Sequence, residues 1–128
     1  MNKYNTYFSA MRNTIEEYRR GGGGIFPYTQ GACKAYRAWA ASVERGNEEP
    51  ELDDFLWEQE VSDFIATLRT AGIESFTITD RSTGLMENLH ALAAEGCTME
   101  GLCMVGRIEP EWGHAKPEAV MGIRFKVN

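Results

Sequence analysis

The sequence lacks any apolar run of about eighteen residues, the length that a membrane-spanning helix requires. It opens with Met1 to Tyr4 and passes directly into a polar-faced helical pattern, without the apolar stretch of a signal peptide. We therefore expect a cytoplasmic protein with no membrane contact.

Cysteine is also scarce, and its placement excludes several kinds of chemistry. Cys33, Cys97 and Cys103 are odd in number and form no CxxC motif, which argues against a disulfide framework. Cys97, Cys103 and His114 do not have the spacing of a zinc site. A cysteine nucleophile paired with His90 or His114 would need a proximity in space that a sequence does not reveal, and Cys103 lies in an apolar run typical of a core residue. We assign no catalytic residue, metal or cofactor.

Positive charge is in deficit, because the chain carries a formal net charge of −6. This charge and the absence of a basic aromatic patch disfavour a nucleic-acid partner. The acidic segment, residues 44–63, holds nine acidic residues against one basic residue. It is a solvated helix face, a docking surface for a basic protein partner or a weak mimic of a nucleic-acid backbone. The candidate partner-contact residues are Asp53, Asp54, Trp57 and Glu58.

The first seventy residues show the spacing of three or four helices. Apolar residues from Tyr4 to Tyr18 share one helical face, and the glycines at 21–24 end that helix as a plain linker. A second helix is expected from about Thr29 to Arg45. A third apolar stripe begins near Leu52 and ends at 71–72, with a kink capped by Ser62.

The rest of the chain alternates between strand and helix patterns. Ser82 is expected to cap the helix that follows the first strand, and Gly96 to end it. The expected elements are a strand at 73–79, a helix to about 95, a strand at 102–108, a loop at 109–117 and a strand at 119–127.

These patterns predict a single α+β domain over residues 1–128, with a helical part at 1–71 and a β-α-β-β part at 72–128. The three strands would form a small mixed sheet covered by helices. Residues 102–108 are apolar on both faces at their start, which favours the middle of the sheet. The alternative is a split β-α-β arrangement, with the last strand between the other two.

The loop at 80–84 is the one place where fold and chemistry coincide. It joins the end of a strand to the start of a helix, where free amides and the helix dipole attract anions. Arg81 could add charge, Ser82 and Thr83 hydroxyl groups, and Gly84 a close backbone approach. These four residues are the candidate ligand site, and helix capping by Ser82 is the structural alternative.

Three stretches, residues 55–64, 82–103 and 120–127, together resemble a group of small uncharacterised proteins of gut Firmicutes. Members of this group are often carried on plasmids or conjugative elements. The resemblance spans nearly the whole chain and implies a mobile-element accessory role. It brings no activity and no functional residues.

We therefore expect a non-enzymatic regulatory or protein-interaction protein that acts through a protein partner. The alternative is an enzyme, or a protein binding a small ligand or anion, with its site at loop 80–84. A homodimer is also expected if the terminal strand exposes an edge and Trp57 or Trp112 lies on the surface.

Overall fold

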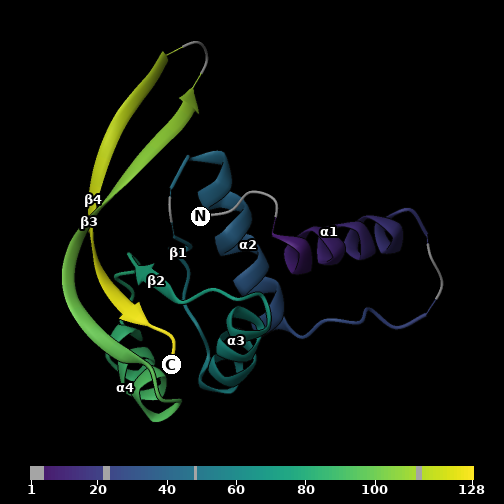
Figure 1. Cartoon of the computed structure of the whole chain (residues 1–128), viewed down its shortest axis with the longest axis horizontal. Helices are drawn as coiled ribbons and strands as arrows, with labels where there is room; N and C mark the ends of the chain where they lie inside the picture. The colour runs from purple at the N-terminus through teal and green to yellow at the C-terminus, as the bar shows by residue number, and fades with distance from the viewer. Residues whose placement is uncertain (1–4, 22–23, 48, 112–113) are drawn as a thin grey trace.

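Four helices pack beside a four-stranded mixed sheet in the part of the chain that the structure describes (Figure 1). The computed structural model describes residues 5–21, 24–47, 49–111 and 114–128, with the side chains of 107–118 outside the description. The α+β class is confirmed. No helix within these residues is both long and apolar enough to cross a membrane.

The expected helices are present, and two begin with side-chain caps. Helix α1 (Thr6–Arg19) starts after Asn5, whose side-chain oxygen accepts a hydrogen bond from Phe8 N. Helix α2 (Gln30–Glu44) starts after Thr29, whose hydroxyl accepts from Ala32 N. The structure also contains α3 (Glu58–Thr70) and α4 (Leu85–Ala94).

The helix expected to begin near Leu52 is wrong over its first residues. Residues 51–52 instead form a short strand, β1 (Glu51–Leu52). Two backbone hydrogen bonds join this part of the chain to the sheet: Thr77 N donates to Pro50 O, and Thr79 N donates to Leu52 O. Residues 53–57 are irregular, and α3 begins only at Glu58. It is continuous through Ser62, so the expected kink is wrong as well.

The strands lie in the order β1-β2-β4-β3, so residues 102–108 are not in the middle of the sheet. Strand β4 (His114–Lys126) pairs antiparallel with both β2 (Ser75–Ile78) and β3 (Thr98–Glu111), while β1 pairs parallel with β2. The split β-α-β alternative is confirmed, with β1 as a fourth strand. The sheet is four-stranded because β1 adds to the β2 edge.

The β3–β4 hairpin is longer than expected, because both strands continue through most of the predicted loop at 109–117. Only residues 123–126 of β4 also pair with β2, so the hairpin is two-stranded beyond the body, and no other described strand pairs with either of its edges there (Figure 1). Free edges tolerate proline, which explains how Pro110 and Pro117 fit. Trp112 falls outside the described residues.

Two groups of aromatic rings join neighbouring elements. Phe125 of β4 stacks on Phe76 of β2 at 5.8 Å between centroids, and Phe76 meets Phe64 of α3 edge-on at 5.5 Å. On the far side of α3, Phe8 of α1 stacks on Trp39 of α2 at 5.1 Å. All five rings are buried. Helix α2 also contacts the sheet directly, because Glu51 N of β1 donates a hydrogen bond to Ser42 Oγ of α2, while α1 packs on α2.

Helices α2 and α3 approach each other at a glycine. A Cβ atom at Gly31 would lie 2.4 Å from the backbone oxygen of Glu60, which is too close for any side chain. This contact positions the start of α3 against the start of α2. It also brings Lys34 of α2 close to Glu60 of α3.

Candidate functional site

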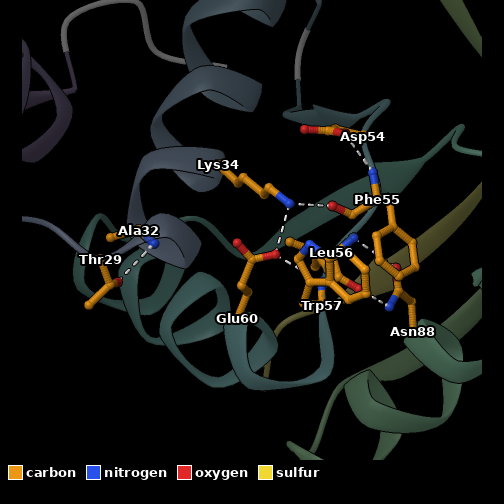
Figure 2. Close-up of polar contacts among 9 residues, drawn as sticks. All are labelled: Thr29, Ala32, Lys34, Asp54, Phe55, Leu56, Trp57, Glu60 and Asn88. Atoms are coloured by element: carbon orange, nitrogen blue, oxygen red, sulfur yellow. Dashed lines mark hydrogen bonds and ion pairs between the residues drawn. The ribbon is translucent and has the colours of Figure 1, made fainter.

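The last three of the five residues between β1 and α3, here called the Phe55–Trp57 segment, lie where α2, α3 and α4 converge (Figure 2). Leu56 is buried, Phe55 is half-buried and Trp57 is 59% exposed. The rings of Phe55 and Trp57 meet edge-on at 4.9 Å between centroids. A short irregular segment thus presents two aromatic side chains above a buried leucine.

An ion pair between two helices holds this segment from one side. Lys34 Nζ lies 2.8 Å from Glu60 Oε1, and it also donates a hydrogen bond to the Phe55 carbonyl. The same Glu60 oxygen accepts from Trp57 N at 2.8 Å, while Glu60 N donates to Trp57 O at 2.8 Å. This reciprocal pattern is that of a helix-capping box. Because both charged side chains are about nine-tenths buried, loss of either would leave a buried charge unpaired.

Asn88 of α4 holds the segment from the other side. Its Oδ1 accepts a hydrogen bond from Leu56 N at 3.1 Å, and its Nδ2 donates to the Leu56 carbonyl. Asn88 is 3% exposed, and both of its amide groups are used. Figure 2 shows Asn88 and Lys34 reaching the segment from opposite directions.

A groove of about 680 Å³ lies between the Phe55–Trp57 segment and α4. Buried Leu56, Val61 and Asn88 form its floor. Trp57 and Met86 stand at its edges, and Met86 is 73% exposed. The remaining lining residues are Phe55, Glu58, Glu87, His90, Ala91, Ala94 and Glu95. The groove has a mainly apolar surface and a volume within the range of ligand and peptide sites.

The structure divides the candidate partner-binding residues of the acidic segment. Trp57 and Glu58 line the groove, whereas Asp53 and Asp54 line a separate hollow of about 180 Å³. Asp53 Oδ2 lies 3.5 Å from Arg45, and Asp54 Oδ1 accepts from Phe55 N at 2.8 Å. All four side chains are exposed, and they line two different hollows.

Several other carboxylates of the acidic segment are structural. Glu51 is 1% exposed, and its carboxylate accepts from the Thr79 hydroxyl and lies 3.4 Å from Arg45. Glu49 binds Arg124 of β4 through both carboxylate oxygens. Together with Glu60, these residues neutralise part of the charge within the fold. The local charge of −8 therefore overstates the negative charge available to a partner.

The candidate ligand residues at 80–84 are engaged with one another and with their neighbours. Asp80 accepts from Ser82 N at 3.2 Å and from the Ser82 hydroxyl at 2.7 Å. Arg81 is exposed and donates to the Met121 carbonyl at 3.3 Å, and Thr83 is exposed. The prediction that Ser82 caps the helix is wrong, because the N-cap residue of α4 is Gly84, which has no side chain to make a capping hydrogen bond.

Gly84 has a packing role. A Cβ atom at this position would lie 1.9 Å from Cε2 of Phe55, so glycine is what allows the Phe55 ring to rest on the start of α4. The close neighbour of the Gly84 backbone is thus an aromatic ring of the same chain, and the approach of a ligand to Gly84 stays a prediction. The residue supports the groove wall.

The cysteines are free thiols in separate environments. Burial raises the pKa of the Cys97 thiol, an effect that nearby Arg69 opposes and Glu95 reinforces. Burial likewise raises the pKa of Cys33, with Arg37 opposing it. A raised pKa reduces the thiolate fraction near neutral pH, so neither sulfur is activated as a nucleophile.

Sequence reasoning missed the α4 side of the groove. Met86 and Ala93 are apolar residues of α4, yet both are exposed, whereas Leu85, Leu89, Ala91 and Leu92 meet the core. Asn88 carried a detectable signal, because a polar residue among those core-facing residues needs a buried hydrogen-bond partner. Its partner, Leu56, is 32 positions away and follows only from the fold.

Comparison with known proteins identifies a family. Residues 34–127 match the model of a family described as "Domain of unknown function (DUF7698)", and the chain belongs to this family. The matched region includes the Phe55–Trp57 segment, Lys34, Glu60 and Asn88, and it leaves α1 outside. No curated protein and no solved structure matches the chain.

Proposed function

We propose that this member of the DUF7698 family is a small non-enzymatic, cytoplasmic regulatory or interaction protein that binds another protein through the groove between the Phe55–Trp57 segment and α4. The observation that carries the proposal is the exposure of Trp57 and Met86 at the edges of an apolar groove. Large exposed aromatic side chains next to well-packed pockets supply much of the binding energy at protein interfaces.

The rigidity of the groove supports the same proposal. Lys34, Glu60 and Asn88 hold the Phe55–Trp57 segment through buried hydrogen bonds from three helices. A surface that is ordered before binding loses less conformational entropy when a partner arrives. The buried contacts thus maintain an exposed apolar surface in one conformation.

We further propose a mobile-element accessory role in gut Firmicutes. Its support is the resemblance of residues 55–64, 82–103 and 120–127 to proteins carried on plasmids and conjugative elements. The first two stretches contain all the described lining residues of the groove, from Phe55 to Glu95. A partner encoded on the same element would suit this role.

The alternative function, binding of a small ligand or anion at loop 80–84, has weaker support. The Asp80 carboxylate already accepts from the Ser82 amide, so a negative charge occupies the position where an anion would sit. Arg81 remains the feature in its favour, because its guanidinium is exposed.

The proposed function is tested by affinity capture from an extract of the source cell, followed by identification of the captured protein and reconstitution with the purified partner. We expect Met86→Glu and Trp57→Ala each to reduce binding of that partner at least about tenfold, the equivalent of 1.4 kcal/mol. Tyr18→Ala is the matched control, because Tyr18 is an exposed aromatic residue on α1, away from the groove. Binding that survives both groove substitutions contradicts the proposal.

A further inference from the structure

The groove has a negative rim. Glu58, Glu87 and Glu95 line it, and no lysine or arginine occurs among the described lining residues. Neither Glu58 nor Glu87 makes an ion pair with a described residue, and both side chains are exposed. Arg69 approaches the end of α4, where its guanidinium donates to the Glu95 and Asn128 carbonyls. The rim formed by Glu58 and Glu87 is therefore available to a positively charged partner.

The backbone of the groove wall is already fully hydrogen-bonded. Phe55 N donates to Asp54, and the Phe55 carbonyl accepts from Lys34. Both backbone groups of Leu56 pair with Asn88, and both backbone groups of Trp57 pair with Glu60. An extended peptide binds a strand or loop through free backbone groups, and this wall has none to offer.

A helix is the form of partner that does not need such groups, because its own backbone bonds are satisfied internally. An amphipathic helix binds a groove through side chains at positions i, i+3 or i+4, and i+7. The floor and walls match this need: Leu56 and Val61 are apolar, and Ala91 and Ala94 are small. Met86 is flexible and adapts to the shape of an apolar partner.

We infer that the groove binds an amphipathic helix of a partner protein, with apolar residues facing Trp57 and Met86 and with lysine or arginine residues facing Glu58 and Glu87. This inference deepens the proposed function and rests on it. The combination of an apolar floor, a saturated backbone and an acidic rim specifies the class of partner.

The test uses the full chain and three fluorescent synthetic peptides of about fourteen residues, a common helix length. The first has leucine on one helical face and lysine on the other, the second replaces lysine by glutamate, and the third scrambles the first. Binding is measured by fluorescence anisotropy at low and high salt. We expect the leucine–lysine peptide to bind best, with an affinity that falls as salt rises because the rim is exposed.

Variants then locate the binding site. The double variant Glu58→Lys, Glu87→Lys should weaken binding of the leucine–lysine peptide about tenfold or more. In the Met86→Glu variant, the leucine–lysine peptide should no longer bind better than its scrambled version, which lacks an apolar face. The matched control is Glu17→Lys, Glu74→Lys, which makes the same charge change at exposed positions that do not line the groove. The control should bind within about twofold of the parent protein. Thermal unfolding verifies that each variant is folded.

Four outcomes would overturn the inference. These are no peptide binding, equal binding of the glutamate or scrambled peptide, equal weakening by the control pair, and self-association of the protein that Met86→Glu removes, which would make a second copy the occupant.

Capture of the partner from extract by the same variants distinguishes failure of this inference from failure of the proposed function. If Met86→Glu reduces capture and the Glu58, Glu87 reversal does not, the interaction role stands and the basic helix is refuted. If neither reduces it, the proposed function fails.

Discussion

Asn88 makes both backbone hydrogen bonds of Leu56, accepting from its N–H at 3.1 Å and donating to its carbonyl. An amide side chain on α4 thus takes the place that a neighbouring strand would have beside the Phe55–Trp57 segment. The contact links residues 32 positions apart and sits at the floor of the groove.

This relationship predicts a specific pattern of stability. Asn88→Ala should lower the free energy of unfolding by about 2 kcal/mol, because it leaves two backbone groups of buried Leu56 unpaired. Asn88→Asp should be no more stable than alanine, since a carboxylate can accept from Leu56 N but is repelled by the Leu56 carbonyl. Chemical denaturation measures both effects. The control is Glu87→Ala at the neighbouring exposed position, which removes none of these hydrogen bonds. An Asn88→Asp variant as stable as the parent would contradict the prediction.

Gly84→Ala should also destabilise the protein, by about 1–3 kcal/mol, because the added methyl group overlaps the Phe55 ring. Combining it with Phe55→Leu should recover part of the loss, since the smaller side chain makes room. A double-mutant cycle measures this coupling. Additive effects of the two substitutions would show that the ring is not the obstacle, and Thr83→Ala, at an exposed neighbour, is the control.

Ser82→Ala is expected to change the free energy of unfolding by no more than about 0.5 kcal/mol, because Ser82 is exposed, its hydroxyl bonds to the Asp80 carboxylate of the same loop, and it caps no helix. Phosphate, nucleotides and carboxylates should give no thermal shift in the parent protein. A shift that Arg81→Ala abolishes would revive loop 80–84 as an anion site.

The terminal strand does not expose an edge at residues 123–126, which pair with both β2 and β3. Self-association stays a prediction, and we now propose it through β3, an edge strand of the described sheet. Leu102 and Met104 of this strand are largely exposed, and no described strand pairs with its outer edge. An exposed apolar edge strand is a template for pairing with a second copy. We expect a concentration-dependent dimer in sedimentation velocity, and Leu102→Lys with Met104→Lys should remove it. Met86→Lys, on α4, should leave it intact. A parent protein that stays monomeric at high micromolar concentration would disprove the prediction.

The placement of the strands shows what sequence patterns could not resolve. The residues at 102–108 are apolar on both faces, and that pattern predicts a central strand, yet Leu102 is 73% exposed at the sheet edge. Phe125 of β4 is buried and its neighbour Lys126 is exposed, as one covered face requires, but this alternation does not indicate that β4 has a strand along each edge. Periodicity reports which side chains favour burial. It contains no information about which neighbour supplies the hydrogen bonds of a strand edge.

The sequence alone determined the local elements, because their signals are local. Thr29 starts α2 through a hydroxyl three residues from the amide it caps, and Gly96 ends α4 with a left-handed φ of 90°. The tertiary structure alone decided the strand order, the burial of Glu51 and the groove. Lys34, Glu60 and Asn88 meet around the Phe55–Trp57 segment only after three helices have packed, and such contacts depend on chain segments that no short window of sequence contains.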